Sequence, residues 1–382
     1  MKRKCLAVGI ILLFIGTAII PLNGQKTEKI SLPMSRENTL YVGGSGPGNY
    51  TKIQDAVDNA SNGDTIFVYH HASPYQEHVL IDKSVTVLGE DTNTTMIDAG
   101  SSEYAISIQA NDVTVEGFTI LTKQYESQGV QIAYTNDTVI SHNVFIHGYI
   151  GVCIFGAKRA LIDHNLFSSE TEGIFVWYNS SHTTISNNTL MNNTKGIRLY
   201  EMDNTNTRII GNICEGNTDI GIGIEVGTTS VLWNSIKSNN VGISINPNVY
   251  DSEIRHNNMN ENQVGLFVEQ GKKSLIISQN NFINNTLGLN SSDSDAVTIT
   301  QNNFIGNTWQ AFFRGFWYQP NRWSGNYWSD FHGKGVKVIF GNVVLFAIPF
   351  GGYYHYFLVF RSPWVNFDWH PAQEPYNITG MS

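Results

Sequence analysis

Apolar and polar positions along this chain follow a short unit that recurs at almost constant distance. The unit is a branched aliphatic residue, two variable residues and an Asn, and successive Asn residues lie 22, 23, 24, 22, 23, 23 and 22 positions apart. Such a period, built from β-branched segments and Asn or Gly turns, is typical of a stacked solenoid. The pairs are Ile140/Asn143, Ile162/Asn165, Ile185/Asn188, Ile209/Asn212, Val231/Asn234, Ile254/Asn257, Ile277/Asn280 and Ile299/Asn302.

Each repeat also carries a second strand that a Gly introduces, as in GVQI at Gly129 and GVCI at Gly151. Few Asn-Gly hairpin turns separate the strands, so parallel stacking of each strand on its counterpart one coil away is the arrangement that satisfies the backbone. We therefore predict an all-β fold, a right-handed parallel β-helix with about 22–24 residues per coil and nine or ten coils.

Strand alternation fixes which side chains face inward. An apolar residue stands two positions after each Asn, and we expect these residues to form an internal ladder that runs from Ile120 to Phe304. The Asn residues are expected at a bend, in left-handed backbone, with their amides bonded to the next coil.

The flanks of the repeats differ in pattern. Thr51 and Gln54 suggest a capping box on a short amphipathic helix that covers one end of the stack. After Thr308 the repeat ends and aromatic residues accumulate. The run 336–360 is apolar but contains Gly, Pro and His, which favours a folded C-terminal cap over a membrane span. The predicted segments are 1–24 signal peptide or membrane anchor, 25–39 linker, 40–112 N-terminal cap and irregular coils, 113–308 regular repeats and 309–382 aromatic C-terminal cap.

The N-terminus has the features of an export signal. Lys2, Arg3 and Lys4 precede an apolar run from Leu6 to Ile20, which is typical of a secretory signal. An uncleaved membrane anchor stays open as an alternative. Both interpretations place the chain outside the cytoplasm, where Asn-x-Ser/Thr sequons can be glycosylated. Such sequons are frequent and include those at Asn49, Asn93, Asn136, Asn179, Asn192, Asn284, Asn290 and Asn377.

Charge and cysteine content narrow the range of partners. The formal net charge is -9 and charged residues make up only 14% of the chain, so nucleic acid is not an expected partner. Three cysteines do not make a disulfide framework. We expect Cys153 to point outward, Cys214 to point inward, and both to be free thiols.

Several segments resemble a known family. The opening YTKIQDAVDNASNGDTIFVY, the later VLIDKSVTVLGED, the Ile-x-x-Asn repeats and SGNYWSDF are similar to NosD-type right-handed β-helix proteins, and the ending PWVNFDWHPAQEPYNI is similar to archaeal surface proteins. The resemblance implies export and, by the family's name, copper binding. It also implies membership of a wider class of carbohydrate-binding and sugar-hydrolysing β-helices. It supplies no ligand motif that can be placed on named residues.

Catalytic candidates lack their partners. Asp163 and His164 resemble part of a pectate lyase motif, a class that binds calcium, but the Arg-x-Pro-x-x-Arg element is missing. Asn217-Thr218-Asp219 resembles a polygalacturonase motif without a second carboxylate, which acid/base hydrolysis needs. We therefore assign no catalytic residue, and a polysaccharide lyase or hydrolase stays an alternative.

Metal binding has one weak candidate. His142 and His164 share a repeat position in adjacent coils, so their imidazoles are expected about one strand spacing apart. Two imidazoles lack the further ligands of a closed metal site. The alternative is that both His residues are structural, lying at the bend and bonded to the backbone. A copper-binding accessory protein is the corresponding function.

The preferred candidate is a row on the second strand. If Val152 and Ile154 point inward, strand alternation turns Phe155 outward, and the same parity turns four residues of the next two coils outward. Aromatic faces along a groove suit sugar rings, whose hydroxyls bond to polar side chains. The alternative is that these aromatics only pack over the corner. We predict a non-catalytic, cell-surface β-helix that binds a glycan, a polysaccharide or a surface protein through Phe155, Phe175, Trp177, Arg198 and Tyr200.

Overall fold

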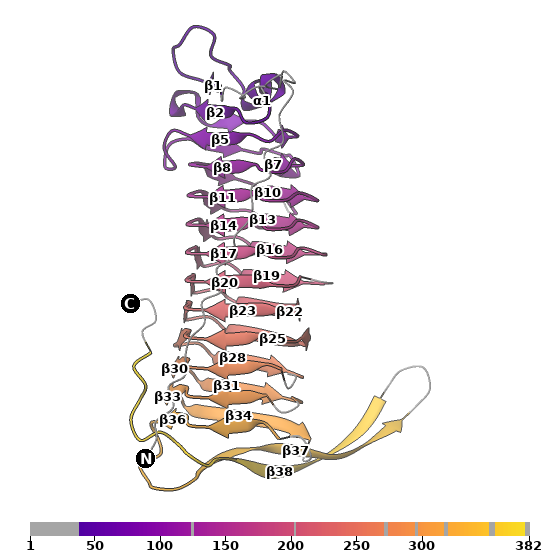
Figure 1. The fold of residues 1–382 in the computed structure, drawn as a ribbon, viewed down its shortest axis with the longest axis vertical. Helices are drawn as coiled ribbons and strands as arrows, with labels where there is room; N and C mark the ends of the chain where they lie inside the picture. Colours follow the sequence, from indigo (N-terminus) through magenta and orange to yellow (C-terminus); the bar gives the residue numbers. More distant parts are fainter. Residues whose placement is uncertain are drawn as a thin grey trace, which may run out of the picture. The chain divides into compact units, whose positions relative to one another are not determined.

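The computed structural model describes residues 38–123, 126–201, 204–270, 274–294, 297–316, 320–350 and 356–378. These residues form a parallel β-helix whose regular coils each contribute three strands (Figure 1). One series of short strands makes a 12-stranded parallel sheet. The prediction of nine or ten coils was therefore too low, because segments on both sides of the regular repeats add coils. The predicted signal segment, 1–24, lies outside the described residues.

The strands fall into three stacked series. The first precedes the repeat Asn and contains β1 (Thr39–Val42), β2 (Thr65–Val68), β5 (Thr86–Gly89), β8 (Thr114–Glu116), β11 (Val139–Ser141), β14 (Leu161–Asp163), β17 (Thr184–Ser186), β20 (Thr207–Ile210), β23 (Thr229–Leu232), β26 (Glu253–Arg255), β29 (Ile276–Ser278), β32 (Thr298–Thr300) and β35 (Arg322–Ser324). The short series contains β3 (Tyr75–Gln76), β6 (Met96–Asp98), β9 (Thr119–Leu121), β12 (Val144–Ile146), β15 (Leu166–Ser168), β18 (Thr189–Met191), β21 (Ile213–Glu215), β24 (Ser235–Lys237), β27 (Asn258–Asn260), β30 (Asn281–Ile283), β33 (Asn303–Ile305) and β36 (Tyr327–Trp328). The Gly-introduced series contains β4 (Val79–Ile81), β7 (Tyr104–Ile108), β10 (Gln128–Ala133), β13 (Ile150–Phe155), β16 (Glu172–Trp177), β19 (Lys195–Tyr200), β22 (Ile220–Gly227), β25 (Val241–Val249), β28 (Val264–Glu269), β31 (Leu287–Ser292) and β34 (Trp309–Phe316).

The bend between the first two series uses two residues with different tasks. The residue before each Asn takes the left-handed conformation, with φ of 51° at His142, 52° at His164 and 59° at Trp233. The Asn itself does not, which corrects the expectation that Asn supplies the left-handed backbone. The Asn instead extends its amide along the stack, because its side chain points inward after the bend.

These Asn residues form a continuous buried ladder. Asn234 is representative: its amide donates to Ile209 O at 3.0 Å and to Asn257 Oδ1 at 2.9 Å, and its Oδ1 accepts the backbone N–H of Asn212 at 2.8 Å. Each side chain thus satisfies backbone groups of neighbouring coils that the bend leaves unpaired. The predicted bonding of each amide to the next coil is confirmed.

A second Asn ladder was missed by the sequence analysis. It stands five positions after the first and precedes the Gly-introduced strand; Asn217 Nδ2, for example, donates to Leu190 O at 3.1 Å and to Asn239 Oδ1 at 2.9 Å. The signal was present in most coils as an Asn three or four residues before the strand's Gly. Its members are Asn193, Asn217, Asn239, Asn262, Asn285 and Asn307, and Glu170 occupies the same position one coil earlier.

The core follows the predicted alternation. Val152 and Ile154 are fully buried, and the internal ladder stacks Phe145 on Phe167 with ring centroids 4.7 Å apart. Cys153, predicted to point outward, is not part of this core cluster and is nevertheless only 3% exposed. Cys153 and Cys214 are free, as predicted.

The N-terminal end carries α1 (Ile53–Asn59), which buries Ile53, Ala56 and Val57. Its N-terminus has no side-chain cap from Thr51, contrary to the predicted capping box. The carboxylate of Glu77, from a neighbouring coil, accepts the backbone N–H groups of Ile53 and Gln54 at 2.9 and 3.0 Å. Among the described residues no helix has the length and apolar character needed to cross a membrane.

The C-terminal end contains one repeat more than the sequence analysis recognised. Trp323 pairs with Ile299 and Trp328 with Phe304, so WSGNYW is a further copy with Trp in place of the aliphatic and Phe positions. Its Asn326 donates to Asp368 Oδ2 at 3.0 Å, and this carboxylate ends the ladder. The apolar run forms an antiparallel hairpin of β37 (Lys337–Phe350) and β38 (Tyr356–Asp368), visible in Figure 1 beyond β34.

Candidate functional site

Register places the predicted row on one edge of the β-helix. Phe155, Trp177 and Tyr200 are paired residues at the ends of β13, β16 and β19. Phe175 and Arg198 are paired two positions earlier on the same strands. All five side chains are partly exposed. The structure therefore brings together the five residues that the sequence analysis selected, and we call them the aromatic row.

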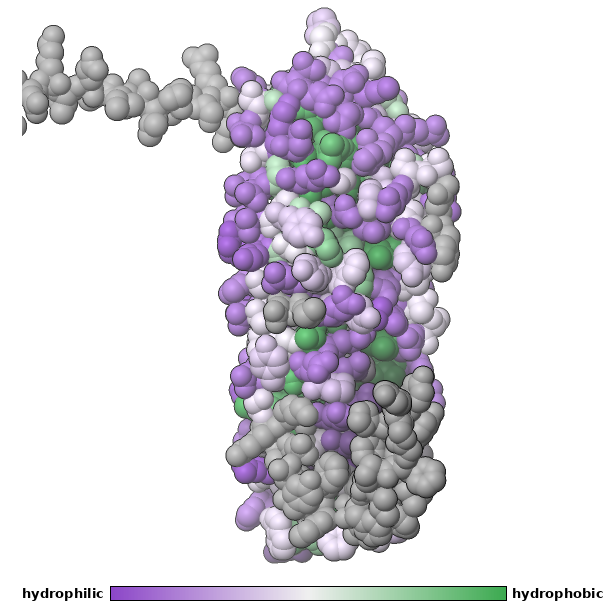
Figure 2. Space-filling view, turned by 90° about the vertical axis from the view of Figure 1, so that its right-hand side faces the viewer, coloured by the Kyte–Doolittle hydropathy of each residue, from purple (hydrophilic) through white to green (hydrophobic). Residues whose placement is uncertain are grey.

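Rings touch from coil to coil along the aromatic row. The centroids of Phe155 and Trp177 are 5.0 Å apart, and those of Phe175 and Tyr200 are 6.1 Å apart. Figure 2 faces the edge toward which β10, β13, β16 and β19 point in Figure 1, and shows apolar and pale side chains among hydrophilic ones. The aromatic row is therefore a mixed surface of ring edges and faces bordered by polar groups.

Two further aromatics extend the aromatic row and were missed from the sequence. Tyr134 and Tyr178 directly follow β10 and β16 and are 69% and 39% exposed. Both contact Phe155, with centroids 5.0 and 5.2 Å away. Both also adopt left-handed backbone, with φ of 55° and 45°, as do Gly156 and Glu201 at the equivalent corner of their coils. The detectable signal was a Tyr at the first turn position after the strand.

Arg198 holds the lower part of the aromatic row in place. Its guanidinium bonds to Glu172 and Glu225 at 2.8 Å each and lies 4.3 Å from the centroid of Tyr200. Burial alone would lower the pKa of Arg198, but the bonds to both carboxylates outweigh it and raise the pKa, so the group stays charged. Trp177 is also anchored, since its Nε1 donates to Glu201 at 2.7 Å.

Cys153 lies beneath this surface, and its thiol has low reactivity. It pairs with Phe175 across β13 and β16. Burial, with a smaller contribution from the negative charge of Glu172, raises the pKa of its thiol to about 12. The thiol is therefore protonated at neutral pH and is a poor nucleophile.

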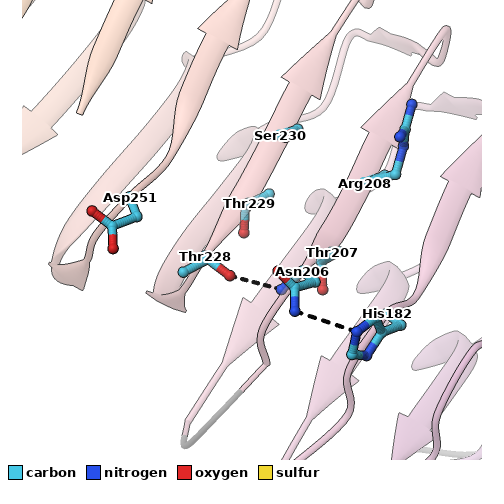
Figure 3. A pocket seen from close by; sticks show the side chains of 8 residues that line it. All are labelled: His182, Asn206, Thr207, Arg208, Thr228, Thr229, Ser230 and Asp251. Carbon is cyan, nitrogen blue, oxygen red and sulfur yellow. Dashed lines mark hydrogen bonds between the residues drawn. The ribbon is translucent and has the colours of Figure 1, made fainter. Parts of the chain in front are cut away.

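A polar groove of ≈ 350 Å³ lies in the coils that follow the aromatic row (Figure 3). Asn206 ties two coils together there, because its backbone N–H donates to Thr228 Oγ1 at 2.7 Å and its amide lies 3.3 Å from His182 Nε2. The hydroxyls of Thr207 and Thr229 are buried in the groove wall with no hydrogen-bond partner among the described residues. The lining residues are His182, Asn206, Thr207, Arg208, Thr228, Thr229, Ser230 and Asp251.

The predicted weak metal pair adopts the expected stacking. The rings of His142 and His164 are parallel with centroids 5.1 Å apart. Each Nδ1 faces its own carboxylate, Glu116 at 3.4 Å and Asp163 at 2.6 Å. Within the described ranges, the three donors close enough to share one ion are found elsewhere, at His70, His71 and Glu90.

Asp163, the residue that resembles the lyase motif, is fully engaged. Its carboxylate accepts from Ser186 at 2.5 Å, from Asn187 at 3.0 Å, and bonds to His164 at 2.6 Å. Burial would raise the pKa of this carboxyl, but the three hydrogen bonds prevail and lower it. The arrangement favours a structural carboxylate that links adjacent coils.

The described residues define a parallel β-helix that carries the aromatic row on one edge. The sequence profile of the family described as periplasmic copper-binding protein (NosD) matches residues 57–248, 105–293 and 228–333. These matches together cover more than half of the chain, which belongs to the NosD family.

Relatives and solved structures agree with this class. A cell surface glycoprotein of Methanothermus fervidus is 34% identical over 104 residues, which are 26% of this chain and 17% of that protein. The match thus spans less than a fifth of the relative's length. The Dettilon tailspike protein has a TM-score of 0.59 at 12% identity, covering 81% of this chain and 73% of that chain. The catalytic unit of a GH87 α-1,3-glucanase from Streptomyces thermodiastaticus has a TM-score of 0.54 at 15% identity, covering 68% and 61%. At these identities both structures show the fold alone.

Proposed function

We propose that this protein is an exported, cell-surface β-helix that binds a glycan along the aromatic row without acting on it chemically. The observation that carries the proposal is the run of partly exposed rings on consecutive coils, extended by Tyr134 and Tyr178. The core needs inward side chains at alternate positions only, so nothing in the repeat itself requires large aromatics on the outside.

The chemistry of the surface suits a carbohydrate. The C–H faces of a sugar ring pack on aromatic rings, while its hydroxyls need donors and acceptors at the border. Arg198, Glu172 and Glu201 border the rings, and the groove beyond offers Thr, Asn, Arg and Asp side chains. The corner after β16 joins the two surfaces, because His182 of the groove lies five residues after Trp177.

The location that the comparisons indicate supports this reading. The NosD family is described as periplasmic, and the Methanothermus fervidus relative is a cell surface glycoprotein. A protein outside the cytoplasm meets envelope polysaccharides directly. The predicted export signal agrees with this location.

Affinity electrophoresis against a panel of soluble polysaccharides tests the proposal. The double variant Trp177→Ala/Tyr200→Ala removes two rings, each worth about 1 kcal/mol in contact with a sugar face. We expect the dissociation constant for the retained polysaccharide to rise by about tenfold or more. The melting temperature should be retained, because both side chains lie outside the core.

The matched control is Trp309→Ala, which removes a ring 61% exposed on the same strand series but outside the aromatic row. This variant should bind as the wild type does. Retention that is equal in the wild type and the double variant for every polysaccharide would refute the proposal. Absence of wild-type retention across the panel would refute it as well.

A further inference from the structure

The N-terminal coils bring two His and one Glu together at a corner far from the aromatic row in the sequence. β2 and β5 are paired in parallel, with Val68 opposite Gly89. His70 and His71 begin a 3-10 turn (His70–Ala72) just after β2, and Glu90 directly follows β5. Because paired strands end at the same edge, the three side chains leave the β-helix side by side.

The donor atoms of these residues are already close. One ligand atom from each of His70, His71 and Glu90 lies within 4.8 Å of the others. His70 Nδ1 and Glu90 Oε2 are 2.5 Å apart, and the two imidazoles stack with centroids separated by 4.3 Å. Small rotations of exposed side chains would set all three donors around one ion, at the 2.0–2.2 Å distances that protein ligands give to zinc-class metals.

The backbone around the cluster is held from several sides. The backbone N–H of Glu90 donates to Val68 O at 2.9 Å, and that of Ser73 donates to His70 O at 2.9 Å. The phenol of Tyr75, 4% exposed, donates to Tyr69 O at 2.6 Å. The turn that carries both imidazoles is therefore fixed before any ligand arrives, which lowers the conformational cost of binding.

The electrostatics favour a cation. The backbone N–H of His70 donates to Glu90 Oε2 at 3.0 Å, which holds the carboxylate beside the two imidazoles. The negative charge of this carboxylate attracts a cation.

We propose that His70, His71 and Glu90 bind a divalent transition-metal ion, with Cu(II) preferred over Zn(II). Two imidazole nitrogens and one carboxylate oxygen suit these ions, and the Irving–Williams order places Cu(II) above Zn(II). Ca²⁺ and Mg²⁺ favour all-oxygen sites. Three protein ligands leave positions for water, so the ion would be exchangeable.

Titration of the full chain with Cu(II), followed by isothermal calorimetry and electron paramagnetic resonance, tests the site. The wild type should bind Cu(II) with a spectrum that shows two coordinated imidazole nitrogens. His71→Ala and Glu90→Gln should each weaken this binding by about tenfold or more. The double variant His70→Ala/His71→Ala should lose the two-nitrogen signal. Mg²⁺ should not compete.

The stacked pair elsewhere supplies the matched control. The double variant His142→Ala/His164→Ala removes two imidazoles that also stack, with centroids 5.1 Å apart, but that share no third donor among the described residues, so its Cu(II) affinity and spectrum should match the wild type. An unchanged two-nitrogen spectrum in the His70/His71 variant would overturn the proposal, as would loss of that spectrum in the His142/His164 variant. Polysaccharide retention should be the same in both variants and in the wild type. A negative result in the metal test would therefore leave the glycan proposal untouched, and the reverse also holds.

Discussion

At the scale of single residues, each corner uses two residues for the bend and for the bonding between coils. The sequence had suggested that the Asn alone does both. A residue such as His142 or Trp233 takes the left-handed bend, and the Asn after it bonds between coils. Spacing predicted the Asn positions because they are invariant in the repeat. It did not reveal the bend residue, because that position tolerates His, Asn, Gly, Trp and Gln and therefore carries no residue signature.

Glu170 shows what happens when one ladder position departs from Asn. It is 3% exposed, accepts a hydrogen bond from the backbone N–H of Gly148, and has no partner for Oε2 among the described residues. Burial raises the pKa of this carboxyl to about 7, from 4.5. Its protonated form is therefore the one that the fold accommodates best.

This environment predicts a pH-dependent stability. Because the folded-state pKa of Glu170 is raised, its contribution is fully present below about pH 4.5 and is lost as the pH rises through about 7. Glu170→Gln, which stays neutral, should thus be more stable than the wild type above pH 7, by on the order of 3 kcal/mol. Urea unfolding from pH 4 to 8 measures the difference. The control Glu374→Gln, at an exposed position, should show no such gain in stability. If the free energy of unfolding varied with pH in the same way for Glu170→Gln and the wild type, the raised pKa of Glu170 would be contradicted.

At the scale of strands and corners, alternation predicted most of the arrangement. It gave the inward ladder and the outward register of Phe155, Trp177 and Tyr200, because both follow from a period of two. Alternation predicts the direction of a side chain but not its exposure, and Cys153, at an outward position, is only 3% exposed. The last repeat was hidden because Trp323 replaces the usual aliphatic residue.

The first Asn ladder should be the main specific stabiliser of the corners. Asn234→Ala would leave the Asn212 backbone N–H and Ile209 O without partners inside the core, and each such group costs about 1–3 kcal/mol. We expect the free energy of unfolding to fall by about 3 kcal/mol or more in urea denaturation. Asn240→Ala, an exposed Asn of the same coil, should change it by less than about 0.5 kcal/mol. Equal effects of the two substitutions would count against the ladder.

At the scale of the whole molecule, the described residues form a stack in which each coil contacts its neighbours, closed by α1 at one end and extended by the β37–β38 hairpin at the other. Such a stack can accept outward substitutions on one edge without disturbing its core. This independence explains why sequence predicts the fold so well and the site only in outline. The repeat specifies inward and corner residues, whereas Tyr134, Tyr178 and the His70–Glu90 cluster lie at turns whose neighbours only the folded chain reveals.

A crystal structure of the full chain with a bound sugar would show directly whether the aromatic row is a glycan-binding surface. The crystals would contain an oligosaccharide cut from the polysaccharide that the wild type retains. We expect sugar rings within about 4 Å of the Trp177 and Tyr200 rings, with hydroxyls directed toward the bordering polar side chains. Sugar bound to another face, with the aromatic row left open to solvent, would contradict it.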